Sequence, residues 1–487
     1  MRINIKRQLM ELISTIEEGI DYISINGNNH SPSMIQDCYE SLQALSSVLS
    51  NEIKVVKLIQ RAMEKVQAFD FNQSDDLFNH NINHLKGIIY NIKSSIIIDI
   101  KNEFEIVFFP YNSSMWDSLE SIYNEAMKDP DCTCYVVPIP YYEKNKEGEI
   151  TRFCYEGNQF PKNVHTIPFE LYDFENRRPD IVYIHNPYDS YNTLTMVNPR
   201  FFSENLAKYT DMLVYVPYFV AGCTETLSLN IMPSYIYANK LIVQSTHLKD
   251  AYIYSGIEQQ KILDLGSPKI DAMLTAVREG LVNIPMHWNQ IIKNRKVFLL
   301  NTGIADLLSS DMWFDRLVHI LNCFIENDKN ILIWRPHPLT QITLKTMRPH
   351  LVNQYEEIER NLKQATNIII DNNSDVYPAI IIADAIISDY SSIMLQSIIT
   401  EKPILGILDE GKTASDLHYY ADYLGCYFAD QDLSVTKFIE MIENNEDLRK
   451  TERITRFKKS LSNTDGTCGM EIHTNIKNEV LKQMKHA

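Results

Sequence analysis

The chain has 487 residues, 45% hydrophobic and 22% charged, a composition typical of a globular protein with more than one domain. Its net charge of −17, from 63 acidic against 46 basic residues, argues against a protein that holds nucleic acid by its phosphates. We find no signal peptide and no apolar run near the roughly 20 residues that span a bilayer. Eight cysteines show no zinc-binding spacing. We therefore expect a cytoplasmic protein with free thiols, at most peripheral to a membrane, and without a bound metal or cofactor.

Residues 1–100 predict helices only, because apolar residues such as Leu9, Ile13, Ile16 and Ile20 recur at the helical period. We expect a helical bundle with no visible chemistry. His80 and His84 lie one helical turn apart and could bind a metal. A solvated helix face explains them better, since no acidic or thiol-rich group accompanies them.

From residue 101 onward, short apolar strands alternate with helices in two blocks, which predicts two doubly wound α/β domains at 101–285 and 286–487. The strands expected in the first block are Glu105–Phe109, Tyr135–Val137, Ile181–Ile184, Leu213–Val216, Leu241–Gln244 and Ile262–Leu265. Those expected in the second are Val297–Leu300, Ile331–Trp334, Ile368–Ile370, Ala385–Ile387 and Ile404–Ile407. In such folds ligands bind at the carboxyl ends of the strands.

The run Asp389-Tyr-Ser391-Ser392 follows one of these strands and opens a helical pattern. Either serine would cap that helix, and free N–H groups at the positive end of a helix attract phosphate. Asp389 could bind a ribose or substrate hydroxyl, or only order the loop. A plain helix cap with no ligand remains the alternative for the whole run.

Arg335 and His337 follow another strand, in a loop stiffened by Pro336 and Pro338. A cation and an imidazole at this position suit a diphosphate-containing donor. His337 could donate a hydrogen bond to the leaving group or stabilise developing charge. Its alternative is a histidine that only packs on the loop.

Three weaker candidates also follow strands. Thr302 and Gly303 follow Val297–Leu300, and the glycine permits close approach of backbone to a ligand. Lys269, in Gly266-Ser-Pro-Lys-Ile-Asp271, is a candidate phosphate contact, although a tight turn into a helix explains that run equally well.

In the first α/β block, His185 and Asp189 follow the strand Ile181–Ile184 and are the best candidates for a general base and its partner. The run Val216-Pro-Tyr-Phe219 occupies a neighbouring strand end and is a candidate lining of the acceptor pocket. The sequence lacks the motifs of serine hydrolases, zincins and P-loop ATPases.

From about 180 to 470 the chain resembles the CDP-glycerol glycerophosphotransferases, the primases and polymerases of teichoic-acid synthesis. The residues that carry the resemblance are Gly266-Ser-Pro-Lys-Ile-Asp271, His337-Pro338, Ile387-Ser-Asp389-Tyr-Ser391-Ser392, Lys402-Pro403 and Asp465-Gly466.

The resemblance implies a GT-B-like fold, in which two Rossmann-type domains face each other behind the helical N-terminal domain. It implies transfer of glycerol phosphate from CDP-glycerol to a lipid-linked or glycan acceptor at the inner face of the membrane, with release of CMP. His337, Asp389, Ser391 and Ser392 would surround the diphosphate. Teichoic-acid and capsule polymers are the cell-surface products to which this chemistry leads.

Three departures bear on the donor and the base. The family's Trp-His-Gly-Thr-Pro motif, whose histidine is the supposed base, is absent, and Leu213-Val-Tyr-Val-Pro217 stands there instead. Gln396 replaces a usually acidic residue, and Glu471 stands where a basic residue is usual. Alternatives therefore remain: a CDP-ribitol or other alditol donor, a nucleotide-sugar glycosyltransferase or epimerase, or a relative that binds nucleotide without turnover.

Overall fold

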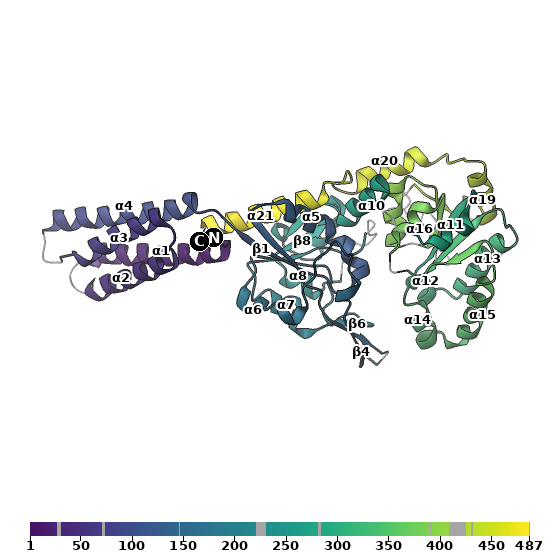
Figure 1. Ribbon diagram of the computed structural model, residues 1–487, viewed down its shortest axis with the longest axis horizontal. Helices are drawn as coiled ribbons and strands as arrows, with labels where there is room; N and C mark the ends of the chain where they lie inside the picture. The colour runs from purple at the N-terminus through teal and green to yellow at the C-terminus, as the bar shows by residue number, and fades with distance from the viewer. Residues whose placement is uncertain are drawn as a thin grey trace.

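The computed structural model describes residues 1–26, 31–70, 74–145, 147–220, 230–280, 284–373, 375–389, 391–408, 425–429 and 432–486. Three parts lie in a row: a helical bundle, a first α/β domain and a second α/β domain (Figure 1). Among the described helices, none combines the length and apolar character needed to cross a membrane.

The bundle consists of α1 (Ile3–Asn26), α2 (Ser31–Val48), α3 (Ile53–Gln67) and α4 (Asp75–Asp99). Each helix turns a stripe of isoleucine, leucine or valine inward, and these stripes form a single core that includes Ile13, Leu42, Ile59 and Ile92. Helical residues at the predicted apolar positions are therefore buried, as the 3.6-residue period requires.

Basic residues at the start of α1 fix the bundle to the first α/β domain. The Arg2 guanidinium contacts the carboxylate of Asp180 at 3.3 Å, and Arg7 contacts Asp211 at 2.5 Å. The Lys6 ammonium is fully buried and donates to the carbonyl of Ile100 at 2.8 Å, which satisfies the C-terminal end of α4. Burial lowers the pKa of Lys6. The bundle is thus joined to the first α/β domain by partly buried ion pairs as well as by the chain itself.

The first sheet has six parallel strands in the order β2-β1-β5-β7-β8-β9. They are β1 (Phe104–Phe109), β2 (Cys132–Val136), β5 (Ile181–Ile184), β7 (Met212–Tyr215), β8 (Lys240–Val243) and β9 (Ile262–Asp264). The connecting helices are α5 (Glu120–Lys128), α6 (Phe174–Arg177), α7 (Ser203–Leu206), α8 (Pro233–Tyr237) and α9 (Thr246–Tyr254). A three-stranded antiparallel sheet, which the sequence did not predict, consists of β3 (Tyr141–Lys144), β4 (Ile150–Cys154) and β6 (Thr195–Val197).

The second sheet repeats the parallel design in the order β12-β11-β10-β13-β14-β15. Its strands are β10 (Val297–Thr302), β11 (Ile331–Pro336), β12 (Ile368–Ile370), β13 (Ala385–Asp389), β14 (Ile404–Ile407) and β15 (Tyr427–Phe428). Its helices are α11 (Met286–Ile292), α12 (Ile304–Ser309), α13 (Trp313–Ile325), α14 (Thr340–Met347), α15 (Val352–Leu362), α16 (Tyr377–Ile382), α17 (Ser392–Ser397), α19 (Val435–Glu443) and α20 (Lys450–Ser460). The predicted pair of Rossmann-type domains behind a helical domain is confirmed.

Two helices depart from the domain boundaries expected from the sequence. The helix α10 (Pro268–Glu279) buries Ile270 and Met273 in the core of the second sheet, although it precedes residue 286. The last helix, α21 (Cys468–His486), returns to the first sheet, where Ile472 and Ile476 join its core (Figure 1). The two α/β domains are therefore interlocked by an exchange of helices.

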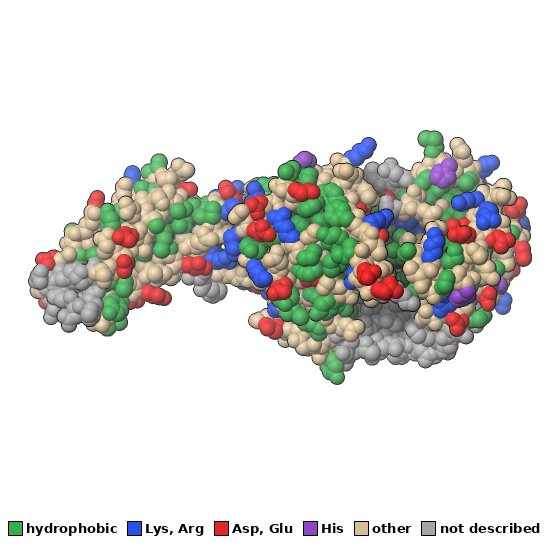
Figure 2. Space-filling view, turned by 90° about the horizontal axis from the view of Figure 1, so that it is seen from below, with side chains coloured by type: hydrophobic (Ala, Val, Ile, Leu, Met, Phe, Trp, Pro, Cys, Tyr) green, Lys and Arg blue, Asp and Glu red, His purple; other side chains and the backbone are tan. Residues whose placement is uncertain are grey.

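The two chain crossings between the domains lie against each other. A Cβ atom at Gly266, whose φ is +94°, would lie 2.3 Å from the carbonyl oxygen of Ser462, so only glycine fits there. Asn463 donates its side-chain amide to the carbonyl of Leu265 at 3.0 Å. In the space-filling view the surface is hollowed where the two α/β domains face each other (Figure 2).

Candidate functional site

The register of the second sheet brings the predicted donor residues to one edge. Asn301 of β10 pairs with Arg335 of β11 on one side and with Ser388 of β13 on the other. Because all three strands are parallel, their carboxyl ends and the loops that follow open on the same side. Residues separated by almost 90 positions in sequence therefore meet within one site.

Gly303 and Asp389 join two of these strand ends directly. The backbone N–H of Gly303 donates to Oδ2 of Asp389. A Cβ atom at Gly303 would lie 2.9 Å from that oxygen and 3.2 Å from Oδ1, so the carboxylate occupies the space of a side chain. Asp389 is 6% exposed. The sequence left two roles open for Asp389, binding a ligand hydroxyl or ordering the loop. The contact with Gly303 is of the loop-ordering kind.

Ser391 caps α17, as the sequence suggested for one of the two serines. Its Oγ accepts from the backbone N–H of Met394 at 3.3 Å and from the side-chain amide of Asn301 at 3.1 Å. Ser392 is the first residue of the helix and is partly exposed. Tyr390, the remaining member of the motif, lies outside the described residues. The serine pair thus sits at the strand-end edge, held there by β10.

His337 lies in the loop after β11 with its two ring nitrogens in different situations. Nδ1 accepts from the backbone N–H of Leu339 at 3.1 Å, and the His337 backbone N–H donates to the carbonyl of Thr302 at 2.9 Å. Burial lowers the pKa of His337, and the nearby Arg335 lowers it further. The ring is therefore neutral at pH 7, and the hydrogen-bond network places its proton on Nε2, a donor for a ligand.

The cation predicted beside His337 is engaged in a buried ion pair. Arg335 Nη1 donates to Oδ2 of Asp371 at 2.5 Å and to the carbonyl of Asp375 at 3.3 Å. The side chains of Arg335 and Asp371 are 8% and 0% exposed. Arg335 therefore braces the His337 loop against the loop after β12, rather than presenting a free guanidinium.

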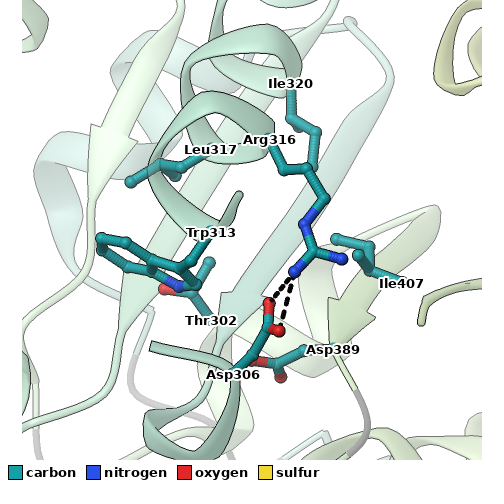
Figure 3. A pocket seen from close by; sticks show the side chains of 8 residues that line it. All are labelled: Thr302, Asp306, Trp313, Arg316, Leu317, Ile320, Asp389 and Ile407. Atoms are coloured by element: carbon teal, nitrogen blue, oxygen red, sulfur yellow. Dashed lines mark hydrogen bonds and ion pairs between the residues drawn. The ribbon is translucent and has the colours of Figure 1, made fainter. Parts of the chain in front are cut away.

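A small hollow lies beside this edge, between α12, α13 and β14, and Figure 3 shows its lining. Arg316 reaches from α13 to Asp306, with Nη2 2.7 and 2.8 Å from the two carboxylate oxygens. Asp389 and Thr302 line the same hollow, and Thr302 Oγ1 accepts from the Trp334 ring nitrogen at 3.2 Å. The Asp306–Arg316 pair has no signal in the sequence, because two charged residues on consecutive helices are also typical of a solvent-exposed surface.

Lys269 is likewise occupied. Its ammonium donates to Oδ1 and Oδ2 of Asp117 at 2.6 and 2.5 Å, across the boundary between the two α/β domains. Both side chains are 9% exposed. The ammonium of Lys269 is therefore engaged in an interdomain ion pair, and the expected phosphate contact stays a prediction. Asp117 lies in the 3₁₀ helix η2 (Ser113–Ser118) and had no sequence signal beyond its carboxylate.

The general-base role suggested for His185 does not agree with its surroundings. The residue is 0% exposed, Nε2 accepts from the backbone N–H of Tyr111 at 3.1 Å, and Nδ1 lies 3.0 Å from Ser118 Oγ. Burial lowers the pKa of His185 to about 3. A ring enclosed on both nitrogens orders the loops after β1 and β5 and cannot reach an acceptor hydroxyl without a rearrangement of these loops.

Asp189, expected to orient that base, faces α7 instead. Its Oδ2 accepts from the backbone N–H of Ser203 at 2.9 Å and from the hydroxyl of the same residue at 2.6 Å. Burial raises the pKa of Asp189 to about 6. Tyr218 and Phe219, of the predicted acceptor-pocket run, are partly exposed at the end of β7. At these strand ends of the first domain, Tyr218 and Phe219 are therefore partly exposed, whereas His185 and Asp189 are buried.

The comparisons with known proteins agree with this architecture. The family model described as CDP-Glycerol:Poly(glycerophosphate) glycerophosphotransferase matches residues 230–477. Comparison with curated protein sequences gave no match.

Among solved structures, the wall teichoic acid polymerase TagF, in a single-residue variant, is similar at TM-score 0.50 and 14% identity, over 85% of this chain and 100% of that one. A protein of Listeria monocytogenes, named as a candidate UDP-N-acetylglucosamine 2-epimerase, is similar at TM-score 0.51 and 12% identity, over 78% of this chain and 97% of that one. These two likenesses show the GT-B-like fold. The family match covers half of the chain and includes the strand ends that carry His337, Asp389 and Ser391, and the chain therefore belongs to the CDP-glycerol:poly(glycerophosphate) glycerophosphotransferase family, a family of transferases.

Proposed function

We propose that the protein transfers glycerol phosphate, or a related alditol phosphate, from a CDP-linked donor to a hydroxyl of a cell-surface polymer precursor. The new bond joins the acceptor oxygen to the donor's distal phosphorus, the diphosphate bridge breaks, and CMP leaves. The observation that carries the proposal is the edge where β10, β11 and β13 bring together Gly303, His337 and the serine pair. The family match supports the same donor class.

The proposed reaction requires few catalytic groups at this edge of the sheet. In phosphoryl transfer the protein contributes chiefly positioning and charge stabilisation. In this proposal the Nε2–H of His337 donates to a phosphate oxygen of the departing CMP, while Ser391 and Ser392 hold oxygens of the transferred phosphate. Arg335 and Lys269 shape the site through their carboxylate partners, Asp371 and Asp117.

The first α/β domain would receive the acceptor, with Tyr218 and Phe219 at its surface. A lipid-linked or glycan acceptor, as in teichoic-acid or capsule synthesis, places the enzyme at the inner face of the cell membrane. Both the acceptor and this location are part of the proposal.

The test is a thermal-shift titration with CDP-glycerol, CDP, CMP and UDP, followed by an assay of CMP release. His337→Asn is the informative variant, because an asparagine side chain can accept the Leu339 N–H locally but does not extend a donor as far as Nε2. We expect cytidine compounds to raise the melting temperature of the wild-type chain. In His337→Asn, we expect CMP release to fall roughly 100-fold, in line with loss of one preorganised donor to developing charge.

Either of two results would contradict the proposal. A preference for UDP would favour a nucleotide-sugar enzyme of the same fold. Cytidine binding without CMP release, with every acceptor class supplied, would favour a nucleotide-binding relative without turnover, a function consistent with the enclosed ring of His185 and the missing Trp-His motif.

A further inference from the structure

Two side chains from distant parts of the chain, Lys269 and Tyr377, meet on the carboxylate of Asp117. Besides the two contacts from Lys269, Oδ2 of Asp117 accepts from the hydroxyl of Tyr377 at 2.7 Å. Asp117 belongs to the first α/β domain, and Tyr377 begins α16 of the second. Lys269 lies on α10, whose apolar face is buried in the second domain. The contacts therefore hold the two α/β domains together.

On the second-domain side, Tyr377 is linked to the His337 loop. Its backbone N–H donates to Oδ1 of Asp375 at 2.9 Å, and the Asp375 carbonyl accepts from Arg335. Arg335 lies two residues before His337 and is also paired with Asp371. Movement of Tyr377 away from Asp117 would thus act on the strand end that carries the candidate donor to phosphate.

Gln396 links the same hydroxyl to the serine pair. Its Nε2 donates to the Tyr377 hydroxyl at 2.9 Å, and the residue is 1% exposed on α17, the helix that Ser391 caps. The hydroxyl accepts from Gln396 and donates its single proton to Asp117, and the Gln396 amide also lies 3.4 Å from the carbonyl of Lys269. A carboxylate at position 396 could not donate, and it would compete with Asp117 for the tyrosine proton.

The local charges make this arrangement sensitive to the fit between the domains. Burial raises the pKa of Glu120, and the nearby Asp117 raises it further. The Lys269 ammonium pairs with Asp117, whose carboxylate lies near that of Glu120 in the first domain and that of Asp375 in the second. Removal of either partner of a buried pair leaves an uncompensated charge, which is strongly unfavourable. The crossing at Gly266, three residues before Lys269, lies next to this group along the chain.

We infer that Tyr377, between Asp117 and Gln396, is a positioning residue that couples interdomain closure to the placement of His337 and the Ser391–Ser392 pair. This role of Tyr377 goes beyond the proposed function. It rests on the proposed function only in the turnover measurement, where the rate of the transfer reaction is read. Tyr377 touches neither reacting group. It acts through Asp375 and Arg335 on one side and through α17 on the other.

The test compares the unliganded full chain with Tyr377→Phe by amide hydrogen exchange. Loss of a hydrogen bond to a charged group predicts exchange at least about tenfold faster in residues 335–340 and 113–118. Tyr183→Phe is the matched control, because the Tyr183 hydroxyl is buried in the first domain and has no hydrogen-bond partner among the described residues. In the control we expect exchange in both segments to match that of the wild type. Should Tyr377→Phe fail to fold, Gln396→Glu is measured instead, with the same segments read together with 391–397.

A second arm measures turnover. In Tyr377→Phe we expect kcat to fall roughly tenfold while the donor KM stays within about twofold, because the donor contacts themselves are retained. Exchange equal to the control would overturn the inference, and so would faster exchange with unchanged kcat. The exchange arm needs no ligand. If cytidine compounds fail to bind the wild type, the proposed function fails, but the exchange measurement still tests the role of Tyr377 at the interdomain contact.

Discussion

The backbone N–H of Gly303 donates to the carboxylate of Asp389, which ties the carboxyl end of β10 to that of β13. The backbone of Gly303 has φ −87° and ψ −178°, a conformation open to any residue, so the backbone conformation does not require glycine. Glycine is required because a side chain would have no space. What excludes a side chain is the carboxylate of Asp389 itself. The geometry of the candidate donor edge thus depends on the absence of a Cβ atom at position 303.

Gly303→Ala should therefore displace Asp389 and weaken nucleotide binding. The new Cβ atom would lie 2.9 Å from Oδ2, so the carboxylate of Asp389 must rotate. We expect roughly a tenfold weaker affinity for the cytidine ligand, measured by calorimetry, with the fold retained.

Gly87→Ala is the control for that substitution. Gly87 is exposed on α4, and a Cβ atom there would meet no atom within 4 Å. Alanine in the middle of a helix should stabilise the bundle by about 0.5–1 kcal/mol and leave nucleotide binding unchanged. Equal effects of the two substitutions on binding would count against the role assigned to Gly303.

Ser391→Ala and Ser392→Ala should differ in stability. Ser391 Oγ accepts from the Met394 N–H and from Asn301, so its loss removes a helix cap and should cost about 1 kcal/mol. Ser392 has no capping contact among the described residues, and its replacement should leave the melting temperature within about a degree. Both variants should bind nucleotide less tightly if the serines hold phosphate. Ligand titration followed by thermal melting measures the two effects separately.

Arg335→Leu should be among the most destabilising substitutions in the second domain. It leaves Asp371, whose side chain is 0% exposed, without its buried guanidinium partner, a loss that typically costs about 3–5 kcal/mol. The comparison is Lys482→Ala, which breaks an exposed pair with Glu479 and should change stability by no more than about 0.5 kcal/mol. Denaturant titration compares the two, and a similar small effect for both would refute the bracing role of Arg335.

His185 should make the first domain sensitive to acid. Its pKa is about 3 in the folded chain against an ordinary 6.5, so the unfolded chain binds the extra proton. Stability from this residue is complete above about pH 6.5 and declines as the pH falls toward 3, by up to about 1.4 kcal/mol per pH unit. His185→Gln removes that slope. Unfolding of both chains at pH 7, 6 and 5 should show a stability difference that shrinks steadily with acid, and a constant difference would disprove the assignment.

Much of the fold could be read from the sequence, and the reason lies in local patterning. The strands Ile181–Ile184, Ile368–Ile370 and Ile404–Ile407 begin and end where the apolar runs predicted. Runs of this kind are fully buried in a parallel sheet, so their signal is strong. In the antiparallel strand β4, the first four residues, 150–153, are exposed and only Cys154 is buried. A strand exposed in this way has no continuous apolar run that would predict it from the sequence.

In the candidate site, too, local features could be predicted from the sequence and long-range contacts could not. Neighbouring residues in one loop, such as Asp389 and Ser391, were found together because the turn from strand to helix is a local event. The assignments of Arg335, Lys269 and His185 were altered by distant partners, Asp371, Asp117 and Tyr111. A cation or an imidazole has the same appearance in a sequence whether it is free for a ligand or paired in the interior.

The sequence by itself determined the helical bundle, the two parallel sheets and the strand ends at which a ligand would bind, because periodicity and turn residues act over a few positions. Only the tertiary structure decided which charged groups stay available. The packing of α21 on the first sheet, and the contacts of Lys269 and Tyr377 with Asp117, arise between segments more than 150 residues apart. Burial then sets the charge state of each group, and burial depends on the whole chain.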